Sequence, residues 1–370
     1  MKIAQIAPLI ESVPPRLYGG TERIVSYVTE ELVALGHDVT LFASGDSITA
    51  ANLVPCVPKA LRLDASVRDT IPYYMLMLDR VRQRADEFDI LHFHIDQFHF
   101  PLFRDIAGRT VTTLHGRQDL PDLHSLYAGF NDMPLVSISN AQRRPVLNIH
   151  FVGTVLHGIP VGLHRAPEAQ RGYLAFLGRI SPEKRPDRAI AIARALGIPL
   201  KIAAKVDRVD EVYFRTQIEP LLAGGGVEFI GEINDQQKSQ FLGGAQALLF
   251  PIDWPEPFGL CMIEAMACGT PVLAFRCGSV PEIIEHGLTG GIVDSVEEAI
   301  AVLPQVIALD RKKVRQRFEQ RFSATRMAKD YVRVYHKLLA STKAGDRLEQ
   351  DRQRALPDGE HATDLRLQIV

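Results

Sequence analysis

The feature that most limits how this chain can fold is a repeated alternation of short apolar runs with longer amphipathic stretches. The runs are rich in β-branched residues and are bounded by glycine or proline, which is typical of buried strands. The stretch 21–35 instead carries apolar residues at helical spacing, with Thr21 as its expected N-cap and Gly36 at its end. This alternation predicts parallel sheets with helices on both faces, an α/β fold.

The pattern restarts after residues 157–160, where glycine and proline interrupt it. A chain of 370 residues also exceeds the ~250–300 residues at which one core usually stops growing. The expected strands lie at 2–8, 38–43, 89–94, 110–115, 135–139, 151–156, 173–177, 200–204, 227–230, 247–250 and 271–275. We predict two Rossmann-like, doubly wound domains at 1–160 and 161–322, followed by a helix at 323–340 that crosses back to the first domain and a charged flexible tail at 341–370.

Composition excludes several classes of protein. The 42 Lys and Arg residues are balanced by 44 Asp and Glu residues, so no nucleic-acid partner is expected. The four cysteines lack the close pairing of a zinc site and are too few for a disulfide scaffold. The chain starts directly in a strand pattern, and no run approaches the ~20 apolar residues of a membrane span. We predict a cytoplasmic protein; Arg80, Arg82 and Arg84 leave open a peripheral contact with the inner face of the membrane, and the oligomeric state is not indicated.

The most informative stretch is 254–272. A helix is expected to begin near Gly259, after a strand and a loop, and to end at Gly269. The N-terminus of a helix in this position offers free N–H groups to a pyrophosphate. Glu256 and Glu264 lie beside it, and carboxylates accept hydrogen bonds from the vicinal diol of a sugar. The stretch favours a sugar-nucleotide site, although two solvated glutamates on a helix surface would give the same spacing.

Two other segments place groups that can bind a phosphate at the ends of strands. Arg179 and Lys184 are cations at the point where the first strand of the second half gives way to a helix. Gly19 and Gly20 lie between the first strand and the first helix, where backbone N–H groups can approach a phosphate or sugar oxygen. Because doubly wound sheets bind ligands beyond the carboxyl ends of their strands, both segments are expected to face a cleft between the domains.

These segments resemble those of retaining glycosyltransferases of the GT-B fold, in glycosyltransferase family four, also called glycosyl transferases group 1. Glu256 and Glu264 match the E-x7-E segment of that family, and Arg179 and Lys184 match its G-R-x-x-x-x-K motif. The resemblance covers about residues 1–340. It implies a GT-B fold in which the N-terminal domain holds an acceptor and the C-terminal domain holds a nucleotide-sugar donor.

The resemblance also implies a role for each matching residue. Glu264 would hold the donor ribose, and Glu256 would lie against the transferred sugar. Arg179 and Lys184 would grip the diphosphate and stabilise it as it leaves. The expected donor-binding residues are Gly19, Gly20, Arg179, Lys184, Glu256, Phe258, Gly259, Leu260 and Glu264, and the expected catalytic residues are His115, Arg179, Lys184 and Glu256.

The candidate residues for the acceptor side lie at the ends of strands in the first half. They are His94, Asp96 and Ser139. His92, His94 and His99 could also suggest a metal site, but apolar residues surround them in the sequence and no cysteine or pair of carboxylates completes a ligand set. We therefore predict no metal, and no cofactor apart from the nucleotide-sugar substrate.

The resemblance implies transfer with retention of configuration, in which the leaving diphosphate takes the acceptor proton. UDP-glucose is the first choice of donor, since pterin glucosyltransferases are among similar sequences, while GDP-mannose and UDP-N-acetylglucosamine stay open. The acceptor is a small molecule, a glycan or a lipid. The alternative is a catalytically altered GT-B protein that only binds sugar nucleotides or acts as an epimerase or phosphorylase.

A first prediction concerns metal dependence. Fixed cations and a helix N-terminus are expected where a divalent ion would otherwise neutralise the diphosphate, so a chelator should leave the rate of transfer unchanged. The measurement is the release of nucleotide diphosphate with and without EDTA. Loss of activity in EDTA that magnesium or manganese restores would show the prediction to be wrong.

Overall fold

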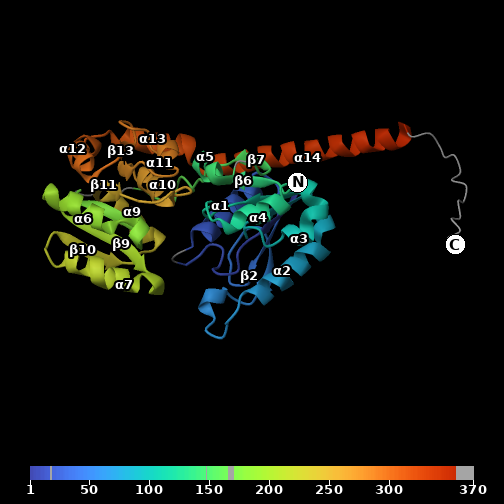
Figure 1. Ribbon diagram of the computed structural model, residues 1–370, viewed down its shortest axis with the longest axis horizontal. Helices are drawn as coiled ribbons and strands as arrows, with labels where there is room; N and C mark the ends of the chain where they lie inside the picture. The colour runs from blue at the N-terminus through green and yellow to red at the C-terminus, as the bar shows by residue number, and fades with distance from the viewer. Residues whose placement is uncertain (17–18, 147, 166–170, 356–370) are drawn as a thin grey trace, which may run out of the picture.

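The chain folds around two parallel β-sheets, one in each half (Figure 1). The computed structural model describes residues 1–16, 19–146, 148–165 and 171–355, with side chains described up to residue 342. Residues 356–370 of the predicted tail lie outside the described residues. Among the described helices, none combines the length and the apolar character needed to cross a bilayer.

The sheet of the first half has the strand order β3-β2-β1-β4-β5-β6-β7. Its strands are β1 (Lys2–Ile6), β2 (Asp38–Ser44), β3 (Asn52–Val57), β4 (Ile90–Phe93), β5 (Thr110–Thr113), β6 (Leu135–Ser137) and β7 (Phe151–Thr154). Its α-helices are α1 (Gly20–Ala34), α2 (Ile71–Gln83), α3 (Phe100–Phe103), α4 (Asp122–Gly129) and α5 (Asn140–Arg143). The central strand β1 is buried from Ile3 to Ile6, as expected of a parallel strand covered on both faces.

The sheet of the second half has the order β10-β9-β8-β11-β12-β13. Its strands are β8 (Tyr173–Ile180), β9 (Leu200–Val206), β10 (Val227–Gly231), β11 (Ala245–Phe250), β12 (Val272–Phe275) and β13 (Gly290–Val293). The α-helices that follow β8 are α6 (Pro186–Ala195), α7 (Glu211–Tyr213), α8 (Glu219–Leu222), α9 (Asp235–Gly243), α10 (Leu260–Ala267), α11 (Val280–Ile283), α12 (Val296–Ile307), α13 (Arg311–Arg321) and α14 (Ala324–Ala355). Two doubly wound parallel sheets confirm the predicted fold class.

The strand order creates one topological switch point in each sheet. β1 pairs with β2 on one side and with β4 on the other, and β8 pairs in the same way with β9 and β11. Chain segments that leave adjacent strands at such a point diverge and open a crevice at the carboxyl ends of the strands. The two crevices face each other between the halves, where they form the walls of the cavity described below.

Three predictions of local structure need correction. The strands β3, which contains Pro55, and β13, which begins with two glycines, were not predicted, because proline and glycine weaken a strand pattern. The N-cap of α1 is Gly19, two residues before the predicted Thr21. The C-terminal helix also continues to Ala355, so helical structure extends past residue 341, where the tail was expected to start.

The helix α14 completes the core of the first half. It leaves the second half and runs along the first, where it contacts α1 and β7 (Figure 1). On the first half of this helix, Met327, Tyr331, Val334 and Leu338 recur at helical spacing and are all buried. Farther along the helix the Thr342 hydroxyl donates to the carbonyl oxygen of Gly108 at 2.7 Å. A helix that follows the whole second half in the sequence is therefore part of the first core.

The main chain crosses between the halves at two neighbouring places. Ile159 and Ser323 form an isolated parallel bridge, with hydrogen bonds from Ile159 N to Phe322 O and from Ala324 N to Ile159 O, both 2.9 Å long. Gly158 lies so close to this bridge that a Cβ atom would stand 2.3 Å from the carbonyl oxygen of Ser323. No side chain fits there unless the backbone shifts.

A second prediction follows from this close approach. Gly158→Ala should lower the free energy of unfolding by about 1–3 kcal/mol, because the new methyl group overpacks against rigid backbone. Gly162→Ala is the matched control, since no described heavy atom lies within 4 Å of a Cβ at that position. Urea unfolding of both variants measures the difference, and equal stability would contradict the proposed crowding.

Candidate active site

A cavity of about 510 Å³ lies between the two halves and is lined by residues from both. Its volume falls within the ~300–1,000 Å³ usual for small-molecule sites. Its lining includes every residue predicted to bind a donor or to act in catalysis: Gly19, Gly20, His115, Arg179, Lys184, Glu256, Phe258, Gly259, Leu260 and Glu264. Segments far apart in the sequence therefore meet where the two switch points predict.

Two helix N-termini open into this cavity, one from each half. The helix α1 begins after Gly19 and α10 begins after Gly259, and neither glycine offers a capping side chain. The two starts lie close together, since a Cβ on Gly20 would stand 3.6 Å from Cδ1 of Leu260. Uncapped N–H groups and the positive ends of two helix dipoles make this part of the cavity suited to an anion such as a diphosphate.

Lys184 and Glu256 pair with each other at the wall of the cavity. They form a hydrogen-bonded ion pair, with side chains 18% and 12% exposed. The same oxygen of Glu256 accepts a hydrogen bond of 2.9 Å from the indole N–H of Trp254, and the Lys184 ammonium lies 4.8 Å from the centre of a Trp254 ring. The pair places an acidic and a basic group side by side in the position where a sugar diphosphate would need both.

Arg179 ends β8 among three carboxylates. Its guanidinium lies 2.5 Å from Glu183, 3.7 Å from Asp207 and 3.7 Å from Asp210. Burial raises the pKa of the Glu183 carboxyl, but hydrogen bonds from its own backbone, Ser181 and Arg179 outweigh burial and leave this pKa lowered. The carboxylates orient the guanidinium at the cavity wall, so an incoming anion meets a cation already in place.

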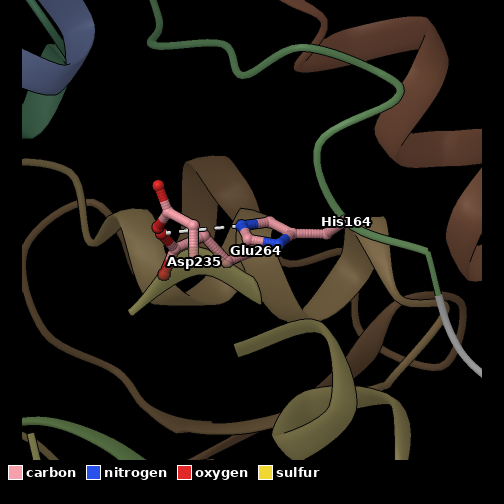
Figure 2. Close-up of side chains that lie close together, drawn as sticks. All are labelled: His164, Asp235 and Glu264. Atoms are coloured by element: carbon pink, nitrogen blue, oxygen red, sulfur yellow. Dashed lines mark ion pairs between the residues drawn. The ribbon is translucent and has the colours of Figure 1, made fainter. Parts of the chain in front are cut away.

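Glu264 is buried within α10 and lines the cavity. It belongs to a charged cluster with His164 and Asp235 (Figure 2). Its Oε1 atom lies 2.8 Å from Nζ of Lys238 and 4.0 Å from Nε2 of His164. Burial raises the pKa of the Glu264 carboxyl, but Lys238 and His164 oppose burial and the net effect is a lowered pKa. Asp235 completes the cluster and pairs with Arg23 of α1, which ties the first half to the second.

Three members of this cluster could in principle ligate a metal. Possible ligand atoms of His164, Asp235 and Glu264 lie within 4.8 Å of one another. However, Lys238 contacts both carboxylates, at 2.8 Å from Glu264 and 3.5 Å from Asp235, and Arg23 pairs with Asp235 as well. Two cations already neutralise the two carboxylates, so the residues present do not fit a divalent ion.

Two histidines predicted for the site, His115 and His94, lie at different depths. His115 lines the cavity, whereas His94 lies behind it, fully buried, with its Nδ1 atom 2.9 Å from Nε2 of His115. Burial lowers the pKa of His115 to about 3 and lowers that of His94 well below its usual range, so both rings are neutral. His94 therefore supports His115 and has no direct access to an acceptor in this structure.

The other two acceptor-side candidates also lie off the cavity lining. The Ser139 side chain is fully buried, where its hydroxyl donates to the carbonyl oxygen of Pro257 at 2.7 Å and accepts from the N–H of Gln142. It therefore joins the two halves. Asp96 is exposed, with a left-handed φ of 52°, and is not among the residues that line the cavity.

Several residues that shape the site were not predicted from the sequence. Lys238 and Arg23 neutralise the buried carboxylates, and His157 stacks on His115 with ring centres 5.3 Å apart. Nothing in the spacing of Lys238 indicates that it reaches α10, because its partner lies on another helix. His157 directly precedes the glycine that interrupts the strand pattern, which was a signal for the end of a strand but not for a side chain in the cavity.

Comparison with known families gives two matches that overlap along the chain. The family described as Glycosyltransferase Family 4 matches residues 18–196, and the family described as Glycosyl transferases group 1 matches residues 165–322. Together they span 18–322, which includes every predicted donor-binding residue.

Comparison with individual proteins agrees with these matches. The N-acetyl-alpha-D-glucosaminyl L-malate synthase of Bacillus anthracis is 23% identical, over 88% of this chain and 96% of its own length. The phosphatidyl-myo-inositol mannosyltransferase of Mycobacterium leprae is 26% identical, over 92% and 98% of the two chains. The crystal structure of Anabaena HepE with UDP and glucose has a TM-score of 0.70 at 18% identity, over 91% of this chain and all of that one, which establishes a shared fold.

A third prediction tests the buried cluster. Lys238→Met should lower the free energy of unfolding by about 3–5 kcal/mol, because it leaves the buried carboxylate of Glu264 without its nearest cation. Lys201→Met is the control: its partner Glu228 is 58% exposed, and exposed pairs contribute only about 0–1 kcal/mol. Denaturant unfolding compares the two, and equally small losses would mean that Glu264 does not depend on Lys238.

Proposed function

The chain belongs to glycosyltransferase family 4, and from this premise we propose that it moves a hexose from a nucleotide-diphosphate sugar to an acceptor held by its N-terminal half. It is a glycosyltransferase with the GT-B fold. The observation that carries the proposal is the convergence of two helix N-termini and two cations, Arg179 and Lys184, on one cavity. That arrangement favours a ligand with two adjacent negative charges.

We propose that the diphosphate of the donor lies between the starts of α1 and α10. There it would replace Glu256 as the partner of Lys184 and Glu183 as the partner of Arg179. Release of Glu256 from Lys184 leaves a carboxylate that can accept hydrogen bonds from hydroxyl groups of the sugar. Glu264 would accept hydrogen bonds from the ribose hydroxyls deeper in the cavity.

Glucose, carried by UDP, is our first choice of donor. The Anabaena structure in complex with UDP and glucose supports this choice at the level of the fold. Relatives that are named for N-acetylglucosaminyl and mannosyl transfer keep the corresponding donors in consideration. The acceptor is a small molecule, a glycan or a lipid, and the first half would select it.

We propose transfer with retention of configuration and without a metal. An oxygen of the acceptor would bond to the anomeric carbon as the bond from that carbon to the diphosphate breaks, on the same face of the sugar. The proton of the acceptor hydroxyl would pass to the departing phosphate oxygen, so no side chain need act as nucleophile. Arg179 and Lys184 would stabilise the charge that grows on the diphosphate.

We also propose a cytoplasmic location. Cys56, Cys261, Cys268 and Cys277 all carry free thiols in the structure, which suits a reducing compartment. Peripheral membrane contact is not needed for the proposed chemistry, and pelleting with liposomes tests it separately.

A panel of nucleotide sugars tests the proposed activity. UDP-glucose, UDP-N-acetylglucosamine and GDP-mannose are compared by thermal shift, because a ligand specific for the folded state raises the melting temperature. Product analysis then follows the best binder with and without added acceptors. Transfer to an acceptor with an unchanged anomeric configuration is the expected result, while isomerised or phosphorolysed sugar without an acceptor would point to an epimerase or a phosphorylase.

A fourth prediction tests the diphosphate site. Lys184→Ala should reduce kcat about a hundredfold or more with a smaller effect on donor affinity, because the lysine binds the charge that develops in the transition state. Arg179→Ala should behave similarly. Lys201→Ala is the control for removal of a lysine that lies off the cavity lining. Near-normal turnover of a folded Lys184→Ala protein would remove this lysine from the active site.

A further inference from the structure

A continuous line of polar side chains runs from the C-terminal helix through the core of the first half to the cavity. Its members are Tyr335 of α14, Gln5 of β1, His94 after β4 and His115 after β5. Gln5, His94 and Tyr335 are at most 2% exposed, and His115 lines the cavity. Buried polar groups of this kind are costly unless each has a partner, so the direction of every hydrogen bond matters.

The side-chain amide of Gln5 determines which groups donate and which accept along this line. Its Nε2 atom, which can only donate, lies 3.3 Å from the Tyr335 hydroxyl and 3.4 Å from Nδ1 of His92. Its Oε1 atom, which can only accept, lies 2.8 Å from Nε2 of His94. His94 therefore carries its proton on Nε2 and donates it to Gln5.

The protonation of His94 in turn fixes the direction of its hydrogen bond with His115. A neutral imidazole has one N–H group and one nitrogen that accepts, so the Nδ1 atom of His94 accepts when its Nε2 atom donates. The hydrogen bond of 2.9 Å between the two rings then has Nε2–H of His115 as its donor. Burial lowers the pKa values of both rings, which agrees with their being neutral.

The plane of the His115 ring is fixed from the other side. His157 stacks on it with an angle of 19° between the rings, and His157 itself lies against Phe258 of the second half, with ring centres 4.9 Å apart. The stack sets the plane, while the hydrogen bond to His94 sets which nitrogen points inward. The Nδ1 atom of His115 has no hydrogen-bond partner among the residues that the structure describes.

We propose that Gln5, held by Tyr335, is a positioning residue that keeps His115 protonated on Nε2, so that its Nδ1 atom accepts a hydrogen bond from a hydroxyl group of the bound sugar. The choice of a sugar as ligand rests on the proposed function, whereas the protonation pattern does not depend on it. The C-terminal helix thereby controls a hydrogen-bond acceptor in the cavity from the opposite side of the core.

Substitutions separate this role from general support of the core. Gln5→Met removes the acceptor for His94 while keeping a similar length, so the proton of His94 can move to Nδ1 and reverse the bond to His115. Tyr335→Phe removes a partner of the Gln5 amide and keeps the ring. Tyr331→Phe is the matched control: its buried hydroxyl bonds to Thr113 at 3.0 Å and reaches Gln5 only through Thr113 and His92, without a direct bond to Gln5, His94 or His115.

The test is ¹⁵N NMR of histidine-labelled protein without ligand, in which long-range spectra distinguish protonated from unprotonated ring nitrogens. We expect His115 to carry its proton on Nε2 in the wild type and in Tyr331→Phe, and to shift toward Nδ1 in Gln5→Met and Tyr335→Phe. With the nucleotide sugar that binds best in the panel, kcat/KM should fall about tenfold in Gln5→Met and Tyr335→Phe. A tenfold fall corresponds to the loss of about 1.4 kcal/mol, the contribution of one hydrogen bond.

A wild-type His115 protonated on Nδ1 would overturn the proposal, even if Gln5→Met failed to fold. So would an unchanged His115 spectrum in both Gln5→Met and Tyr335→Phe. Because the spectra need no substrate, a protein that transfers no sugar but shows the expected protonation would contradict the proposed function and leave the positioning role intact.

Discussion

The structure depends on bringing two helix N-termini, one from each half, to the same cavity. Positive helix ends and several cations in one space would repel one another if nothing neutralised them. Each cation named in the site therefore has a carboxylate: Lys184 pairs with Glu256, Arg179 with Glu183, and Lys238 with Glu264. A diphosphate that enters the cavity takes the place of these carboxylates as the partner of the cations. The cations are therefore neutralised both with and without the ligand.

The interface between the halves includes the same kind of interaction. Arg23 pairs with Asp235 across it, and the Ser139 hydroxyl reaches the carbonyl of Pro257. The carboxylate of Glu282 accepts hydrogen bonds from the backbone N–H groups of Asn140 and Ala141. These polar contacts lie beside apolar ones, because buried residues of both halves, such as Ile138 and Phe258, belong to one core cluster.

Sequence reasoning succeeded where local chemistry decides the outcome and failed where distant partners do. The fold class, the helix between Gly259 and Gly269 and the gathering of Arg179 with Glu264 at one cavity follow from strand periodicity and from the rule for switch points. The roles assigned to these residues are still predictions. The burial of His94 depends on Gln5 and His115, which lie on other strands of its own half, and the contact of Ser139 with Pro257 depends on how the two sheets face each other. No local pattern encodes either. The strands β3 and β13 escaped notice because proline and glycine hide a strand that neighbours on the sheet stabilise.

The path of α14 has a consequence for how the protein is made. Tyr331 and Tyr335 fill the core of the first half, yet the ribosome adds them after the whole second half. Until then His92 lacks the hydroxyl that bonds its Nδ1 atom at 2.7 Å, and the apolar face that α14 covers is open to solvent. The nascent first half therefore stays incomplete until α14 has been made, and in that interval it exposes apolar surface of the kind that chaperones bind.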